Sequence, residues 1–358
     1  MTGPEVPRRA QIIGTGLIGG SVGLALSALG WHVTGSDRDG DAVVAALARG
    51  AVHEAGTDPA AELVVIALPV GAVVDAARAA LVDHPDAVVT DVGSVKAHIV
   101  ASVGDPRFVG GHPMAGSEQE GVAGSDPTMF RGAVWALTPT PTTDGDAYAT
   151  LHSVISALGA EVVTLDAADH DQVVAMISHV PHLTAATLMR LASGRASEQA
   201  PLLRMAAGGF RDMTRIAAGH PGIWPDICAE NRTAIVTVLD DLITELGQVR
   251  ETVARADRDQ LLADLEGARV ARLNLPTTAT RPDELVELRV TVPDEPGQLA
   301  AVTTLATELS VNIYDIELAH SAEGPRGVMI LVIDADAVDA ITTGLEARGY
   351  RVSSRSVS

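Results

Sequence analysis

Cysteine is almost absent from this chain of 358 residues, which contains only Cys228. A single cysteine excludes an internal disulfide and any multi-cysteine metal site, and it is typical of proteins in a reducing compartment. Uninterrupted apolar runs of about 18 residues, the length that a membrane-spanning helix requires, are also missing. The N-terminal segment MTGPEVPRR leads directly into AQIIGTG without a signal-type apolar stretch. We therefore expect a cytoplasmic protein with no membrane partner and no bound metal.

Basic residues are scarce relative to acidic ones. The 25 lysine and arginine residues face 46 aspartate and glutamate residues, which gives a formal net charge of -21. Such a chain repels the phosphate backbone of nucleic acids, and no basic stretch is long enough to make a local exception. An anionic small molecule is compatible with the composition, because a few arginines in a cleft outweigh acidic groups that salt screens beyond about 10 Å. Only one of the basic residues, Lys96, is a lysine.

Three patterns follow one another along the chain. Between Ala10 and Thr164, short apolar runs alternate with amphipathic segments, which predicts a doubly wound parallel α/β sheet and a Rossmann-type dinucleotide-binding domain at residues 8–165. Residues 166–274 show long helical periodicities, so we expect an all-helical domain whose helices need a partner to cover them. The Pro- and Thr-rich segment 275–283 is a predicted linker. Residues 284–358 then follow the βαββαβ order of ferredoxin-like domains.

A glycine-rich motif follows the first predicted strand. In the sequence GTGLIG at residues 14–19, the glycines allow a tight turn and a close backbone approach to a pyrophosphate at the next helix N-terminus. Asp37 ends the following apolar run about 20 residues later, where an acidic residue binds an adenosine ribose and disfavours the 2′-phosphate of NADP. The sequence therefore predicts NAD binding. The adjacent Arg38 leaves NADP open, and a turn that only packs a helix on the sheet is the structural alternative.

Two further segments end buried strands of the predicted sheet, and ligands in open α/β sheets lie outside the carboxyl ends of the strands. One segment contains Pro69, and the other is DVGSVK with Ser94, a candidate hydrogen-bond donor near the nicotinamide. The alternative role of Ser94 is the N-cap of the helix in VKAHIVASV. The predicted cofactor-binding residues are Gly14, Gly16, Leu17, Ile18, Gly19, Asp37, Arg38 and Pro69.

Histidines and arginines mark the remaining motifs. His112 lies in GGHPMAGSE, a predicted Gly- and Pro-rich loop between strands, where a histidine is poorly placed for core packing, and imidazole titrates where a general base works. The segment SHVPH contains His179 and His182, but it lacks the cysteines and the HExxH spacing of a zinc site, so metal binding is the weaker interpretation. Arg211 and Arg215 in GGFRDMTR either bind a carboxylate in bidentate fashion or lie on a solvated face.

Together, GTGLIGGS, DVGSVK, GGHPMAGSE, SHVPH and GGFRDMTRIA followed by a tryptophan resemble the prephenate/arogenate dehydrogenase family in order and spacing. The resemblance implies that His112 is the catalytic histidine and that Ser94 is its hydrogen-bonding neighbour at the substrate hydroxyl. It implies that Arg215 holds a substrate carboxylate and that acidic residues gate this arginine. The other implied substrate-binding residues are His182, Ser117, Glu118, Asp212 and Trp224. In this family the helical domain is the dimer interface, so a homodimer is implied.

The C-terminal pattern resembles an ACT domain, a small module that senses amino acids, through DEPGQL at residues 294–299 and VNI at residues 311–313. A helix that begins at Gly297 would offer backbone amides to a ligand carboxylate. An aromatic amino acid, first of all L-tyrosine, is the expected effector. A ferredoxin-like unit used only for assembly is the structural alternative. The implied regulatory residues are Asp294, Gly297, Gln298, Leu299 and Asn312.

The family resemblance implies oxidative decarboxylation of prephenate to 4-hydroxyphenylpyruvate with NAD, in tyrosine biosynthesis. His112 would accept the proton of the substrate hydroxyl, hydride would pass from the ring to the nicotinamide, and carbon dioxide would leave as the ring becomes aromatic. Arogenate, with an amino group in place of the keto group, is the alternative substrate. Two further hypotheses are another NAD(P)-dependent dehydrogenase that uses Lys96 as its acid or base, and a non-catalytic sensor of a dinucleotide and an amino acid.

Overall fold

The computed structural model describes residues 7–117, 119, 121–196, 205–274, 285–293, 295–309, 311–320 and 326–356. The chain divides into two compact units, Met1–Leu246 and Gly247–Ser358. The predicted linker at residues 275–283 lies outside the described residues. Across the described ranges, no helix has both the length and the apolar character needed to cross a membrane.

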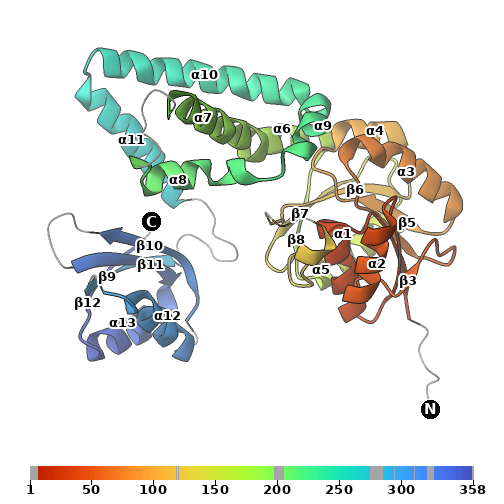
Figure 1. Ribbon diagram of the computed structural model, residues 1–358, viewed down its shortest axis with the longest axis horizontal. Helices are drawn as coiled ribbons and strands as arrows, with labels where there is room; N and C mark the ends of the chain where they lie inside the picture. The colour runs from red at the N-terminus through yellow and green to blue at the C-terminus, as the bar shows by residue number, and fades with distance from the viewer. Residues whose placement is uncertain are drawn as a thin grey trace. The chain divides into compact units, whose positions relative to one another are not determined.

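An eight-stranded sheet with the order β3-β2-β1-β4-β5-β6-β7-β8 organises the first unit (Figure 1). Its neighbouring strands pair in parallel, as expected, with one exception: β6 and β7 are antiparallel. The described chain between these two strands holds only a short 3-10 helix, η1 (Val122–Gly124), and a direct return of this kind joins antiparallel strands. The strands are β1 (Arg9–Ile13), β2 (His32–Ser36), β3 (Glu54–Ala55), β4 (Leu63–Ile66), β5 (Val88–Asp91), β6 (Phe108–Pro113), β7 (Val134–Thr138) and β8 (Glu161–Thr164).

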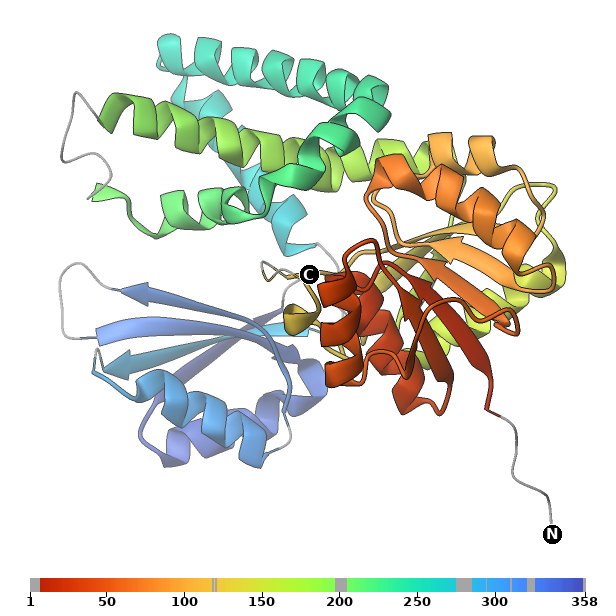
Figure 2. The same cartoon turned by 45° about the vertical axis from the view of Figure 1, so that its right-hand side comes forward.

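Helices cover both faces of this sheet. On one face lie α1 (Leu17–Ala28), α2 (Gly40–Arg49) and α5 (Gly145–Ala157); on the other lie α3 (Val70–Asp83) and α4 (Ala97–Val103) (Figure 2). All four residues of β4 are buried, with Val65 in the core below one set of helices and Val64 in the core below the other. A continuous apolar strand is what a sheet covered on both faces requires. The Rossmann-like α/β fold expected for this part of the chain is confirmed.

The middle of the chain is helical, as expected. A single long rod is formed by α6 (Ala167–Val174), the π-helical segment η2 (Ala175–His179) and α7 (Val180–Ala196). Val180 and Ala175 pack against Ile235 and Val238 of α10, so α7 and α10 lie side by side (Figure 1). The described elements between α7 and α10 (Arg232–Ala254) in sequence are α8 (Gly208–Thr214), η4 (Arg215–Ala218), η5 (Pro221–Ile223) and α9 (Trp224–Glu230).

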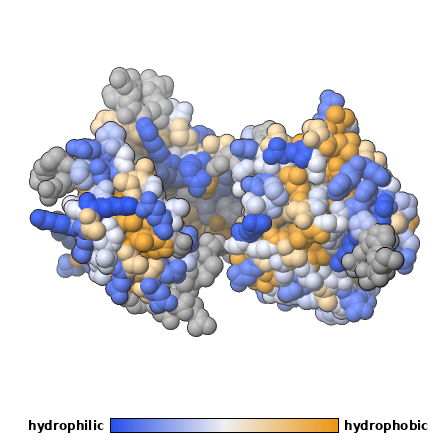
Figure 3. Space-filling model, turned by 90° about the horizontal axis from the view of Figure 1, so that it is seen from below, coloured by the Kyte–Doolittle hydropathy of each residue, from blue (hydrophilic) through white to orange (hydrophobic). Residues whose placement is uncertain are grey.

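The second unit contains α11 (Arg258–Leu273) and an α/β region with the element order βαββαβ. Its antiparallel sheet has the order β10-β11-β9-β12, and the core between the sheet and its helices includes Leu288, Val302 and Ile341. Figure 3 shows a molecular surface on which hydrophobic patches alternate with hydrophilic side chains. The elements are β9 (Leu285–Pro293), α12 (Gln298–Glu308), β10 (Ile313–His320), β11 (Arg326–Asp334), η7 (Ala335–Ala337), α13 (Val338–Ala347) and β12 (Arg351–Ser356).

Candidate active site

In the turn between β1 and α1, two glycines lie too close to other backbone atoms to carry a side chain, and a third faces open space. Gly14 has a φ of 98°, and a Cβ atom there would overlap the carbonyl oxygen of Ala67. A Cβ atom on Gly19 would overlap the carbonyl oxygen of Gly14. A Cβ atom on Gly16, the N-cap of α1, would meet no atom within 4 Å. The loop therefore leaves free space at a helix N-terminus, which is what a pyrophosphate needs.

Asp37 lies directly beside this turn. Its Oδ2 accepts a hydrogen bond from the backbone N–H of Thr15 at 2.8 Å, and its Oδ1 accepts one from the N–H of Asp39 at 3.0 Å. Arg38 is exposed, and Pro69 is the exposed N-cap of α3. Leu17 and Ile18, in the first turn of α1, are half-buried. A carboxylate held next to the glycine turn fits the ribose of a dinucleotide.

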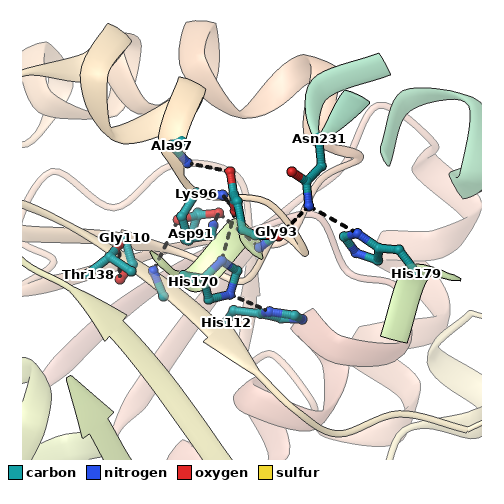
Figure 4. A network of polar contacts seen from close by, with 12 residues as sticks. Asp91, Gly93, Lys96, Ala97, Gly110, His112, Thr138, His170, His179 and Asn231 are labelled. Atoms are coloured by element: carbon teal, nitrogen blue, oxygen red, sulfur yellow. Dashed lines mark hydrogen bonds and ion pairs between the residues drawn. The ribbon is translucent and has the colours of Figure 1, made fainter. Parts of the chain in front are cut away.

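Asp91 connects the loop after β5, which carries Ser94, to strand β6, which carries His112. The prediction of a loop around His112 is therefore wrong at this position, because His112 pairs with Ala136 inside the sheet and is buried. Its Oδ2 accepts from the N–H of Gly93 at 2.9 Å, and its Oδ1 accepts from the N–H of Gly111 at 3.2 Å. Gly93 precedes the half-buried Ser94, and Gly111 precedes His112. A single buried carboxylate thus fixes the backbone on both sides, at the carboxyl ends of β5 and β6 (Figure 4).

Lys96 is fully buried and forms an ion pair with Asp91. Burial lowers the pKa of the Lys96 ammonium, and the charge of Asp91 opposes this effect. Because its Nζ is enclosed and paired, Lys96 is poorly placed to exchange protons with a substrate. This geometry argues against the alternative in which Lys96 is the acid or base of another kind of dehydrogenase.

The start of α4 is capped by a residue from a distant part of the chain. The N–H of Lys96 donates to Asp171 Oδ1 at 2.8 Å, and the N–H of Ala97 donates to Asp171 Oδ2 at 2.9 Å. The helix begins at Ala97, and its N-cap is Lys96. The alternative that Ser94 is the N-cap is therefore wrong, because α4 begins later and Asp171 of α6 supplies the capping carboxylate.

His112 is in contact with a second histidine that sequence analysis did not single out. The Nδ1 atom of His112 lies 2.9 Å from Nε2 of His170, and Nδ1 of His170 lies 2.9 Å from Oδ1 of Asp171 (Figure 4). All three side chains are buried, with relative exposures of 9%, 1% and 5%. In the sequence, the pair occurs as DHDQV near the start of a helix, where polar residues ordinarily indicate a solvated face.

Burial governs the electrostatics of this cluster. It holds the pKa of His112 well below the usual value of a histidine, and electrostatic interactions with the neighbouring His170, Lys96 and His179 lower this pKa further. Burial likewise lowers the pKa of His179 to about 4. His112 is therefore a neutral imidazole at neutral pH and is able to accept a proton.

An aromatic pair adjoins the histidine cluster. His182 stacks on Trp224 with ring centroids 3.7 Å apart, and His179 meets the same tryptophan edge to face at 6.1 Å. Asn231 links this side to Asp171: its Nδ2 donates to the Asp171 carbonyl oxygen at 2.7 Å and lies 3.2 Å from His179 Nδ1. In the described part of the chain, no cluster of three or more His, Cys, Asp or Glu side chains is arranged to hold a metal.

The other predicted substrate residues lie on exposed segments. Arg215 is the exposed first residue of η4, and Asp212 is exposed in α8. Both segments pack against α7, which also carries His182. Ser117 is exposed in the chain after β6, and Glu118 lies outside the described residues.

In the C-terminal region, Gly297 has a φ of 96° and is the N-cap of α12. The Oε1 atom of Gln298 accepts a hydrogen bond from the hydroxyl of Tyr350 at 2.8 Å. Leu299 is 48% exposed, and Asn312 is exposed as well. Asp294 lies outside the described residues. The exposed side chain of Leu299 thus lies in the first turn of α12, next to the backbone N–H groups of the helix N-terminus.

Comparisons with known proteins follow the same division of the chain. The family model of the nucleotide-binding domain of prephenate dehydrogenase matches residues 22–164, and that of its dimerization domain matches residues 166–267. The chain is 33% identical over 261 residues to prephenate dehydrogenase of Bacillus subtilis, covering 71% of this chain and 70% of that protein. It is 35% identical over 207 residues to cyclohexadienyl dehydrogenase of Zymomonas mobilis, covering 56% of this chain and 71% of that protein.

Solved structures give the same result. Prephenate dehydrogenase from A. aeolicus, in complex with hydroxyphenyl propionate and NAD+, superposes with a TM-score of 0.71 and 29% identity, covering 76% of this chain and all of that one. Arogenate dehydrogenase from Synechocystis superposes with a TM-score of 0.66 and 30% identity, covering 74% of this chain and 98% of that one. By sequence and by fold, the chain belongs to the prephenate dehydrogenase family.

Proposed function

We propose that the protein is an NAD-dependent prephenate dehydrogenase that converts prephenate to 4-hydroxyphenylpyruvate in tyrosine biosynthesis. The observation that carries the proposal is the burial of His112 at the carboxyl end of β6, beside the loop that carries Ser94, and this burial lowers the pKa of the imidazole. The glycine turn and Asp37 lie at the carboxyl ends of β1 and β2, along the same edge of the sheet. Family membership and the A. aeolicus structure with NAD+ support the same cofactor here.

His112 is the proposed general base. Its neutral imidazole accepts the proton of the substrate hydroxyl, and Ser94 forms a hydrogen bond at the same oxygen. Bound NAD supplies the hydride acceptor for the carbon that carries this hydroxyl. Loss of the ring carboxylate as carbon dioxide then completes an aromatic ring, so the protein has to orient the ring and exclude competing geometries.

The substrate anchors are proposed on the α7 side of the helical region. Arg215 binds a substrate carboxylate, and Asp212 and Glu118 control access to that arginine. The stacked pair of His182 and Trp224 forms an aromatic wall for the ring, a role that its 3.7 Å stacking supports. Ser117, in the segment after β6, is the remaining proposed contact.

Steady-state assays of the purified protein test this proposal. We expect the highest kcat/KM with prephenate and NAD+, among assays that combine prephenate or arogenate with NAD+ or NADP+. A preference for arogenate would assign the alternative function, which the Synechocystis relative makes the second candidate. Turnover of hydroxy acids without activity on either substrate would indicate another dehydrogenase, and tight NAD+ binding without any turnover would indicate a sensor.

We propose three domains with the limits 8–165, 166–274 and 284–358, the last two joined by a linker at 275–283. The helical domain forms a homodimer, which its match to a dimerization domain supports. The βαββαβ region is proposed to be an ACT domain that binds an aromatic amino acid at the start of α12, and its element order and the positive φ of Gly297 support this. Proposed localisation is the cytoplasm.

A further inference from the structure

We propose that His170 and Asp171 are positioning residues, which hold His112 in the tautomer whose Nε2 is free to accept the substrate proton. The inference rests on the proposed function of His112 as a base. It concerns residues that none of the recognised motifs contains. A chain of two side-chain contacts leads from Asp171 through His170 to His112, and the proton in each contact determines the position of the next.

The first step concerns Asp171. A carboxylate oxygen accepts hydrogen bonds and donates none. Its Oδ1 accepts from the N–H of Lys96 and lies 2.9 Å from Nδ1 of His170. His170 must therefore carry its proton on Nδ1 and donate it to Asp171.

The second step passes this constraint to His112. We take His170 in its neutral form, which carries one N–H, so a proton on Nδ1 leaves Nε2 of His170 as an acceptor. That atom lies 2.9 Å from Nδ1 of His112, which therefore carries the proton of this contact. The remaining nitrogen of His112, Nε2, is left with a free lone pair, as a general base requires.

The third step is the rigidity of the anchor. Asp171 is held from three directions: Oδ1 by the N–H of Lys96, Oδ2 by the N–H of Ala97, and its carbonyl oxygen by Asn231 Nδ2 at 2.7 Å. Its carboxylate cannot rotate without breaking hydrogen bonds and leaving backbone N–H groups without their acceptors, which costs free energy. The same carboxylate therefore caps α4 and sets the proton position on both histidines.

Substitutions at His170 separate positioning from packing. His170→Phe removes the acceptor for His112 Nδ1, and we expect kcat with prephenate to fall by about 100-fold, with KM for prephenate and NAD+ little changed. His170→Gln keeps a side-chain oxygen that can accept from His112 and should recover at least about 10-fold of that loss. The control is His84→Phe, since His84 is a buried histidine outside the cluster with 2% exposure. Its kcat should be unchanged.

An unchanged kcat in His170→Phe, or equal losses in His170→Phe and His170→Gln, would overturn the inference. The tautomer itself is measured on the wild-type protein by ¹⁵N NMR of labelled histidines, with the His112 signals assigned by their loss in His112→Asn. We expect a protonated Nδ1 and an unprotonated Nε2 on His112, and the reverse would overturn the inference even if both His170 variants failed to fold. The NMR measurement does not depend on turnover. Failure of the proposed function, which would appear as an inactive wild-type protein with prephenate, is therefore distinguishable from failure of the inference.

Discussion

The two α/β regions of this protein differ in what they bury. The Rossmann-like region encloses Asp91, Lys96, His112 and, from the adjoining helix, His170 and Asp171. In the described part of the C-terminal region, the one buried charged side chain is Glu287, which pairs with Arg289 at 2.7 Å, and the core is otherwise apolar. Burying a polar group costs free energy unless it is fully hydrogen-bonded. The C-terminal region shows that an α/β core can form with almost no buried ionisable side chains. The buried ionisable side chains of the Rossmann-like region therefore indicate a catalytic role.

The two sheets also differ in how helices cover them. The eight-stranded sheet is covered on both faces and presents the carboxyl ends of its parallel strands to ligands. In the C-terminal region, helices α12 and α13 pack against the four-stranded antiparallel sheet and share one hydrophobic core with it. The family models end at residue 267, before the antiparallel sheet begins. We therefore assign catalysis to the first unit and a separate task to the C-terminal region.

Replacing the proposed base should have the largest effect. His112→Asn should lower kcat by roughly 100-fold to 10,000-fold, the usual contribution of a positioned general base. Binding of NAD+, measured by calorimetry, should change little, because the glycine turn and Asp37 are separate from His112. Near-normal turnover in this variant would show that His112 is not the base. The buried ionisable groups of the Rossmann-like region would then no longer indicate catalysis.

The carboxylate anchor is the next test. Arg215→Ala should raise KM for prephenate by about 10-fold to 150-fold, the worth of 1.5–3 kcal/mol for a charge-assisted hydrogen bond. Because Arg215 is exposed, the melting temperature should stay near that of the wild type. Arg211→Ala is the matched control, since Arg211 is also exposed and lies in the adjacent α8. A KM that rises only in the control would move the anchor to Arg211.

Burial of His112 makes a prediction about pH. A base works in its unprotonated form, and its lowered pKa keeps that form populated at pH values below the usual 6.5 of a histidine. We therefore expect kcat/KM to stay level as the pH falls through 6.5 and to decline, about tenfold per pH unit, only in more acidic solution. A decline centred at or above 6.5 would show that the proton acceptor is solvated.

Cofactor choice should respond to Asp37. Asp37→Ala should weaken NAD+ binding by about 10-fold and narrow the gap to NADP+, because a hydrogen bond to the ribose and a repulsion of the 2′-phosphate disappear together. Asp39→Ala is the control, because Asp39 is exposed and caps α2 through the N–H of Asp41. A wild-type protein that already prefers NADP+ would contradict this assignment of Asp37.

Removing the C-terminal region should have the smallest effect on catalysis. A protein ending at Pro276 should keep kcat within about twofold of the full chain and lose any response to L-tyrosine. The test pairs steady-state kinetics with calorimetry of aromatic amino acids on both proteins. A full chain that binds none of these amino acids, or equal inhibition of both proteins by tyrosine, would contradict a regulatory role for the C-terminal region.

Sequence alone predicted those features that depend on local patterns. The glycine turn, Asp37 at the end of the next strand and the βαββαβ order each follow from a short window of residues, and the structure contains all of them. The antiparallel pairing of β6 with β7 was missed, since a strand signal carries no direction. The N-cap role considered for Ser94 was wrong because the cap comes from Asp171, 75 residues after Lys96.

The contact of His112 with His170 illustrates the same limit. These residues are 58 positions apart, and the DHD sequence in α6 resembles a solvated helix face until the fold places it against β6. The resemblance to a family located His112, but neither spacing nor composition could supply its partner. Buried polar contacts between distant elements are tertiary properties, and they require coordinates.

The most direct test of the central claim is to count the products of prephenate turnover by the full-length protein. The protein should form NADH and carbon dioxide in equal amounts when prephenate labelled in its ring carboxylate is supplied with NAD+, and 4-hydroxyphenylpyruvate should accompany them. His112→Asn should form all three products at the same greatly reduced rate. NADH formed without carbon dioxide, or neither product from the wild-type protein, would contradict the account.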